Sequence, residues 1–288
     1  MTWQQETDAV RGLRQALQHP VEQIRTDAEG RTLWRTAGGE MWAPKGAGIN
    51  YVTQVAVEMR ANVYDLSFLK TATRPAIVLD CGANIGYFAR YALEAGVSRV
   101  VAFEPSPGNA DCLRLNTAAD AAKVTIVQEG VWDREDTLCF STKGAHNPGG
   151  HHVTDEAHAD IRIPVTTIDQ VVERLGLSYV DYIKMDVEGA ESKAIAGARE
   201  TIRRFKPIMS IATEHTSDLF QNTLDVIEAV QKVDSSYEYL CTEAHPYTSP
   251  SRGRILTPFS LLFTAGGRRG RGEKPLSRET EVPVSSRS

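Results

Sequence analysis

The segment 78–88 combines residue types and spacing that suit a nucleotide-binding turn. An apolar run ends in Asp80, and Gly82 and Gly86 follow before a helical pattern begins. Glycine lets the backbone approach a ligand where a β-carbon would clash, and a helix start offers free N–H groups and the positive end of a dipole. The segment therefore predicts a buried strand, a tight turn and a helix N-terminus that face a ligand.

A second acid follows about one strand–helix unit later. The apolar run Arg99–Phe103 ends in Glu104, where a carboxylate suits the two hydroxyls of a ribose. The glycine spacing D-x-G-x-x-x-G differs from the G-x-G-x-x-G of dinucleotide folds. Together these signals predict a nucleoside-type cofactor and disfavour an NAD-dependent enzyme.

Four acids follow the carboxyl ends of predicted strands: Asp80, Glu104, Asp186 and Glu214. In an open α/β sheet the ligand binds beyond these ends, where the strand order reverses. Each acid alone could instead cap a helix. Four acids at one sheet edge are better explained by a ligand than by packing.

Neighbouring residues extend the predicted site. Asn84 starts the helix, where its amide can bind a ligand or cap the helix. The run 128–132 follows the third predicted strand. There Val131 or Trp132 could pack against a nucleobase, and Glu129 could accept from its amino group, although Trp132 could equally belong to the core.

Two basic side chains lie close to these acids in the sequence. His215 follows Glu214 and has an ordinary pKa that suits a proton acceptor near neutrality, or it is a surface or capping histidine. We expect His215, Glu214 or Asp186 to be the base that accepts a proton from a bound hydroxyl. If His215 acts alone, the rate should rise with pH through an inflection near pH 6–7. Lys184 points to the other face of its strand from Met185, toward an acid or a substrate.

A metal site is the alternative use of the acids near Asp186. Asp186, Glu188 and Glu191 could supply oxygen ligands to a divalent cation, and on a helix the two glutamates would share a face. Both glutamates also favour a helix N-terminus without any ion. We therefore expect no metal, and turnover that EDTA does not suppress.

Composition bounds the class of protein. The chain has 288 residues, 41% of them hydrophobic, and a net charge of −5, which suits a packed core and implies no global attraction to nucleic acid. Four cysteines without C-x-x-C spacing predict no zinc knuckle and no disulfide framework. With no signal-peptide pattern and no run of about 18 apolar residues, the sequence predicts a cytoplasmic protein without a membrane span.

The pattern of elements predicts three regions. Residues 1–70 predict a cap or lid, with helices over 1–19 and 51–69 and a hairpin over 21–42. Residues 71–265 predict the main domain. Residues 266–288 hold six Arg or Lys and lack apolar periodicity, which predicts a disordered tail.

The main domain alternates strand and helix patterns, which is typical of a mostly parallel, doubly wound α/β sheet. The predicted strands lie near 76–80, 99–103, 124–128, 180–185, 207–213, 237–241 and 259–263. The predicted helices lie near 84–95, 107–118, 167–175, 189–204 and 217–232. Between them, 138–165 predicts a strand, a loop and a strand.

Three motifs resemble those of the FkbM-type methyltransferases. They are DCGANIG at 80–86, FEP at 103–105 and VDYIKMDVEGAE at 180–191, and the resemblance covers roughly 58–264. It implies the class I methyltransferase fold, with seven strands of which the last is antiparallel, and S-adenosylmethionine as cofactor. Cys81 departs from the family's usual Val or Ile, which is a small apolar change.

The resemblance implies that the nucleoside bound at the predicted site is S-adenosylmethionine. The cofactor-binding residues are then Asp80, Gly82, Ala83, Asn84, Gly86, Glu104, Pro105, Glu129, Gly130, Val131 and Asp186. It also implies O-methylation of a hydroxyl on a small molecule, such as a natural product or a sugar. The net charge and the lack of a long apolar run predict no nucleic-acid or membrane partner. N-methylation, disfavoured by the lack of an N/D-P-P-Y motif, and a non-catalytic nucleoside-binding protein are the alternatives.

Overall fold

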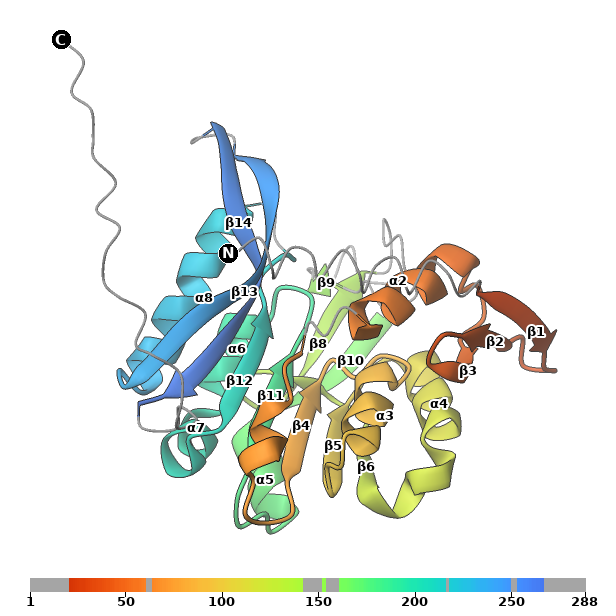
Figure 1. Cartoon of the computed structure of the whole chain (residues 1–288), viewed down its shortest axis with the longest axis horizontal. Coiled ribbons are helices and arrows are strands. Elements are labelled where there is room, and N and C mark those ends of the chain that lie inside the picture. Colours follow the sequence, from red (N-terminus) through yellow and green to blue (C-terminus); the bar gives the residue numbers. More distant parts are fainter. Residues whose placement is uncertain are drawn as a thin grey trace.

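A seven-stranded sheet forms the centre of the computed structural model, which describes residues 21–60, 64–141, 152–153, 161–215, 218–249 and 253–266 (Figure 1). In spatial order its strands are β13 (Tyr237–Ser249), β14 (Gly253–Ala265), β12 (Ile208–Ala212), β11 (Tyr182–Met185), β4 (Ile77–Cys81), β5 (Arg99–Phe103) and β6 (Val124–Val127). Only β14 runs against the others in this sheet. The predicted class I methyltransferase architecture is confirmed.

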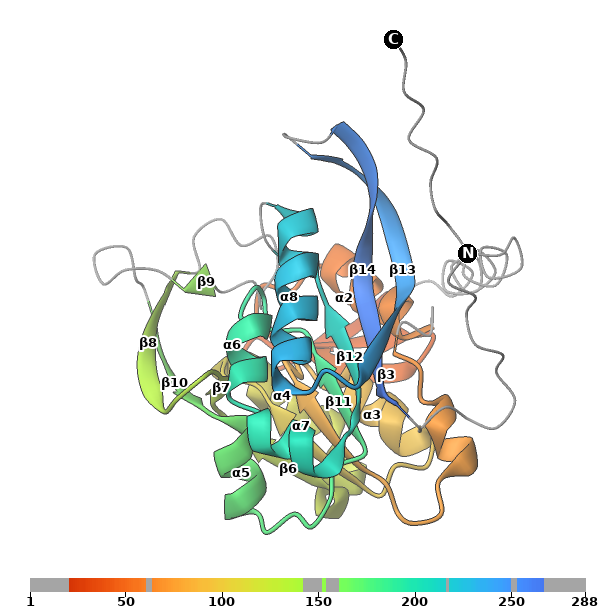
Figure 2. The ribbon, with the colours of Figure 1, turned by 90° about the vertical axis from the view of Figure 1, so that its left-hand side faces the viewer.

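Helices cover both faces of this sheet, as its apolar strands require. One face is covered by α3 (Tyr87–Glu94) and α4 (Pro107–Asn116). The other is covered by α5 (Ile168–Arg174), α6 (Glu191–Ala196), α7 (Arg199–Phe205) and α8 (Leu219–Val233). Figure 2 shows the second group stacked along one side of the sheet.

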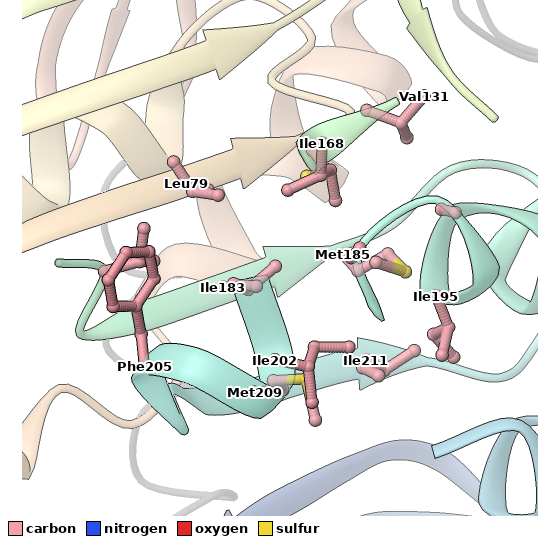
Figure 3. Close-up of a cluster of buried hydrophobic side chains, with 14 of the residues drawn as sticks. Leu79, Val131, Ile168, Ile183, Met185, Ile195, Ile202, Phe205, Met209 and Ile211 are labelled. Atoms are coloured by element: carbon pink, nitrogen blue, oxygen red, sulfur yellow. The ribbon is translucent and has the colours of Figure 1, made fainter. Parts of the chain in front are cut away.

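The core on the second face holds the strand ends in place. Leu79, Ile183 and Met185 of the sheet face Ile195 and Ile202 of the helices (Figure 3), and all five are fully buried. Burial of each such side chain contributes about 1.5–3 kcal/mol. Because this packing fixes the central strands, it also fixes the segments that follow them.

The N-terminal region that is predicted to form a cap contains a small antiparallel sheet and a helix, and we refer to residues 21–60 as the cap. Its strands are β1 (Glu22–Thr26), β2 (Thr32–Thr36) and β3 (Gly39–Ala43), and α2 (Ile49–Arg60) follows. The predicted hairpin is confirmed, and its turn is held by Asp27, which accepts the N–H groups of Glu29 and Arg31. The predicted helix over 1–19 lies outside the described residues.

The predicted helix over 51–69 is wrong in its second half. Helix α2 ends at Arg60, and a separate 3-10 helix, η1 (Ser67–Thr71), follows. The side chain of Asp65 accepts both the N–H and the hydroxyl of Ser67. Such a local bond competes with a continuous helix.

The predicted helix over 189–204 is two helices, α6 and α7, separated at Gly197. A β-carbon on Gly197 would lie 2.0 Å from the carbonyl oxygen of Trp132. The break therefore lets a distant backbone segment approach this one. A second 3-10 helix, η2 (Ala118–Lys123), follows α4.

The chain between β6 and α5 forms a second, four-stranded sheet. Its strands are β7 (Gly130–Val131), β10 (Ile161–Thr166), β8 (Asp136–Ser141) and β9 (His152–Val153). The strand–loop–strand predicted over 138–165 thus appears as β8 and β10, which pair antiparallel. The final pair, β13 and β14, is longer than predicted and projects as a ribbon beyond the sheet (Figure 1). No helix in the described part of the chain has the length and apolar character to span a bilayer.

Candidate active site

A cavity opens at the carboxyl ends of four neighbouring strands of the central sheet. The predicted site residues that line it are Gly82, Ala83, Asn84, Glu104, Pro105, Gly130, Val131 and Asp186. They follow β4, β5, β6 and β11, which lie side by side. Five other predicted site residues, Asp80, Gly86, Glu129, Glu214 and His215, do not line it.

The glycine turn after β4 is held against the neighbouring strands. The N–H groups of Gly82 and Ala83 donate to the carbonyl oxygen of Phe103 at 3.1 and 2.9 Å. Gly82 has a φ of 78°, and a β-carbon there would lie 1.8 Å from the carbonyl oxygen of Asp186. A side chain at Gly82 would therefore meet the backbone that follows β11, so this glycine serves the fold as well as the approach of a ligand.

Gly86 also serves packing. Its φ is 87°, and a β-carbon there would lie 2.5 Å from a methyl carbon of Leu113 in α4. The residue allows α3 and α4 to approach closely at the end of the turn. We therefore expect Gly86 to shape the cofactor turn without touching the cofactor.

Glu104 presents a buried carboxylate to the cavity. Its Oε2 accepts the N–H of Asn84 at 2.8 Å, and its Oε1 accepts the N–H of Ser106 at 2.9 Å. Burial raises its pKa to about 7, although these two N–H donors oppose the shift. The side chain of Asn109 also hydrogen-bonds this carboxylate and opposes the shift, and the lone pairs that remain can accept a hydroxyl.

Asp80 lies behind the turn. It is fully buried, and its Oδ1 lies 3.4 Å from the Nζ of Lys184, the residue opposite it in β11. Lys184 also donates to the carbonyl oxygen of Gly82 at 2.6 Å. Asp80 does not line the cavity, and Lys184 links it to the turn, so we expect Asp80 to act on a ligand only through the turn.

Asp186 lies among three donors at the end of β11. Its Oδ2 accepts the hydroxyl of Tyr64 at 3.2 Å and lies 3.8 Å from Lys184, and its Oδ1 lies 3.2 Å from the Nε2 of His215. Burial would raise the pKa of Asp186, but the charges of Lys184 and His215 lower it. The carboxylate is therefore ionised at neutral pH.

His215 is paired with acids on both sides of its ring. Its Nδ1 lies 3.2 Å from Glu191, whose carboxylate also accepts the N–H groups of Val187 and Gly189. Burial alone would lower the pKa of His215, but the bond to Glu191 and the charge of Asp186 raise it to about 10. At this pKa the ring is an imidazolium at neutral pH, so we expect no inflection of His215 in the rate near pH 6–7.

The two glutamates near Asp186 do not share a helix face. Glu188 precedes α6, has a φ of 56° and lines the cavity, whereas Glu191 is fully buried against His215. Among the described residues, no group of three or more His, Cys, Asp or Glu side chains is arranged to hold a metal ion. The ring of His215 lies beside Glu191 and Asp186.

The far end of the cavity is apolar. Val131 and Trp132 line it together with Phe140, Ile163 and Val165 of the second sheet. Glu129 instead faces Arg174 at 3.5 Å, outside the cavity, so its predicted contact with a base is not supported by this placement.

Sequence reasoning missed several lining residues, among them Tyr64, Asn109 and Phe140. Asn109 carried a usable signal, because it is a polar residue in the first turn of α4 after a predicted cofactor strand. Phe140 carried none, because its place depends on how the second sheet folds over the first.

A model of the methyltransferase FkbM domain matches residues 80–240 of the chain, more than half of its 288 residues. The chain belongs to the FkbM methyltransferase family. The matched region contains the glycine turn, Glu104, Asp186 and His215. Of the three predicted catalytic residues of this FkbM-family chain, only Asp186 lines the cavity at the sheet edge. His215 contacts Asp186 and lies 3.8 Å from Glu214.

Three similar proteins match this FkbM-family chain over different parts of their own length and of its length. The 2-O-methyltransferase NoeI of Sinorhizobium fredii is 26% identical over 180 residues, 56% of this chain and 72% of NoeI. The AMB antimetabolite synthetase AmbE of Pseudomonas aeruginosa is 30% identical over 164 residues, 42% of this chain and only 8% of AmbE. A methyltransferase FkbM from Methylobacillus flagellatus, solved by crystallography, is 20% identical with a TM-score of 0.46, and the match covers 76% of this chain and 56% of that one. None of these likenesses identifies an acceptor for this chain.

Proposed function

We propose that this chain methylates a hydroxyl oxygen of a small-molecule acceptor, with S-adenosylmethionine as methyl donor. The observation that carries the proposal is the order of groups along the sheet edge. Apolar Val131 follows β6, the acid Glu104 follows β5, the Asn84 turn follows β4, and Asp186 follows β11. This order matches adenine, ribose, sulfonium and acceptor in a bound cofactor and its substrate.

Two observations support the fit of this cofactor. The carboxylate of Glu104 is buried in the cavity with acceptor capacity for the ribose hydroxyls. Asn109 also lines the cavity, and its buried Oδ1 has no hydrogen-bond partner within the described structure. Buried polar atoms are rarely left unpaired, so a ligand donor is the expected partner of this oxygen.

When bound, S-adenosylmethionine supplies a methyl group on a positively charged sulfur, which keeps the bonding electrons when the methyl group leaves. The protein must then position the acceptor and take its proton. Of the three predicted bases, only Asp186 lines the cavity. A hydroxyl becomes strongly acidic as its oxygen is methylated, so an ionised carboxylate is a sufficient proton acceptor.

The neighbours of Asp186 then have positioning roles. His215 and Lys184 keep its carboxylate ionised, and the hydroxyl of Tyr64 orients it. Glu214 lies 3.8 Å from His215 and does not reach the cavity. We expect Asp186→Asn to lower the rate by about 10²–10⁴ while S-adenosylhomocysteine still binds.

Titration calorimetry with S-adenosylhomocysteine and with NAD tests the cofactor. Binding of S-adenosylhomocysteine in preference to NAD supports the proposal, and the reverse preference overturns it. Transfer of labelled methyl from S-adenosylmethionine to matched hydroxyl and amino sugars then tests the acceptor atom. Label on nitrogen would favour N-methylation, and binding without transfer to any member of the panel would favour a nucleoside-binding protein.

A further inference from the structure

The N-terminal cap reaches the cofactor turn through Tyr51 of α2. Tyr51 is buried, and its hydroxyl donates to the Oδ1 of Asn84. The backbone N–H of Asn84 in turn donates to Oε2 of Glu104 at 2.8 Å. Three segments that are far apart in the sequence thus form one chain of hydrogen bonds that ends at the acid predicted to bind the ribose.

Asn84 holds a conformation that needs support. Its φ of 51° is in the left-handed region, which residues with a side chain adopt at a cost, although asparagine adopts it more readily than most. In this conformation its N–H points to Glu104 while its side chain points to Tyr51. Loss of the Tyr51 hydroxyl would leave Asn84 freer to take other conformations, and the Glu104 carboxylate would lose a fixed donor.

The cap is packed firmly enough to hold Tyr51 in place. The buried cluster around Tyr51 includes Val52 and Val55 of α2 together with Ile85 and Tyr87, which flank the end of the turn. Val55 also lines the cavity.

A second set of hydrogen bonds joins the cap to the same turn. The side-chain nitrogen of Asn116 donates to the carbonyl oxygens of Trp42 and Ile85 at 2.9 and 2.7 Å. The cap and the turn therefore form one packed unit, in which a change in the cap can reach the cofactor site.

We propose that Tyr51 is a positioning residue of the cofactor site, whose hydroxyl holds Asn84 in the conformation that fixes the Glu104 carboxylate for the ribose. The proposal rests on the proposed function, because it assigns Glu104 to the cofactor. Tyr51 lies outside residues 80–240, which the family model matches. The cap of this chain is therefore part of its cofactor site and more than a cover over it.

The test is the dissociation constant of S-adenosylhomocysteine, measured by calorimetry on the full chain. Tyr51→Phe keeps the buried ring and removes only the hydroxyl. We expect it to weaken binding by about 3- to 10-fold, the range for loss of one hydrogen bond. Glycine adopts the left-handed conformation without help, so in an Asn84→Gly background the same Tyr51→Phe change should alter the constant by less than about twofold.

Thr36→Val is the matched control. It removes the hydroxyl that accepts from the Tyr87 hydroxyl at 2.7 Å and from the N–H of Gly38, and that donates to the carbonyl oxygen of Gly39. This loosens the cap and removes no hydrogen bond of Asn84. We expect a lower melting temperature with binding within about twofold of the unchanged protein. Equal weakening by Thr36→Val, or equal effects of Tyr51→Phe in both backgrounds, would show general loosening of the cap and overturn the proposal.

The same measurements separate this proposal from the proposed function. If the unchanged protein binds S-adenosylhomocysteine and Tyr51→Phe binds it equally well, the role of Tyr51 is wrong and the proposed function stands. If the unchanged protein does not bind S-adenosylhomocysteine, both are wrong. Thermal unfolding of each variant confirms that a weaker affinity reflects the site and not an unfolded fraction.

Discussion

Glu104 is a buried acid whose ionisation should control cofactor affinity. Its pKa is raised to about 7 by burial, and ribose hydroxyls donate best to the ionised form. Affinity for S-adenosylhomocysteine should therefore rise between about pH 6 and pH 8 and level off above that range. Glu104→Gln should flatten this profile and weaken binding by about 1–3 kcal/mol.

Calorimetry across this pH range measures both effects. Glu129→Gln is the matched control, because Glu129 faces Arg174 and not the cavity. We expect it to leave affinity and pH profile unchanged. If the affinity of Glu104→Gln still rises with pH as in the unchanged protein, Glu104 does not bind the ribose.

His215 should stabilise the fold as a cation. Its folded pKa of about 10 lies above the ordinary value of 6.5, so folding favours the protonated ring. This stabilisation is complete below about pH 6.5 and is lost as the pH rises through about 10. The melting temperature should fall over that range, and less so in His215→Gln.

Nuclear magnetic resonance of the His215 ring gives a direct check. We expect no titration midpoint between about pH 6 and pH 8, because Glu191 and Asp186 stabilise the imidazolium. A midpoint near the ordinary value would contradict the buried pairing and would restore His215 as a candidate base.

At the scale of elements, the turn after β4 touches the end of β11. A β-carbon at Gly82 would lie 1.8 Å from a backbone oxygen of Asp186, and backbone cannot move aside as a flexible side chain can. We expect Gly82→Ala to lower the free energy of unfolding by more than about 3 kcal/mol, from left-handed strain and steric overlap together.

Gly96→Ala is the matched control in a denaturant titration. Gly96 has a φ of 102° and no neighbour within 4 Å of an added β-carbon, so only backbone strain applies, at about 1–2 kcal/mol. Equal losses in the two variants would mean that the turn and β11 are not in close contact. Because Gly82→Ala is expected to destabilise the fold, its effect on cofactor binding is informative only where the variant is shown to be folded.

At the scale of the whole molecule, the domain should end at the last strand. Truncation after Gly266 removes the predicted tail, which lies outside the described residues. Because that segment lacks the apolar content to offset its ordering entropy, we expect the melting temperature to change by no more than about one degree. A drop of several degrees would mean that the tail packs on the domain.

Truncation after Ser249 is the contrasting control. It removes β14, which lies between β12 and β13 and buries Leu261 and Phe263. We expect that variant not to fold. Thermal unfolding of both truncations thus locates the end of the folded domain.

The sequence by itself determined the strands of the central sheet and the edge at which the site lies. Strand β5 is found where it was predicted, and β4 within one residue. The reason is that apolar runs and glycine turns report local burial and local backbone conformation. The same local signals brought Asn84, Glu104 and Asp186 to one cavity.

Only the tertiary structure decided what each polar group faces. Gly82 meets Asp186 and Asp80 meets Lys184 across adjacent strands that are about a hundred residues apart in the chain. His215 owes its raised pKa to acids on other segments. Such contacts follow from packing between distant segments, and the strength of a charge depends on the burial and neighbours that packing creates, which no local pattern in the sequence records.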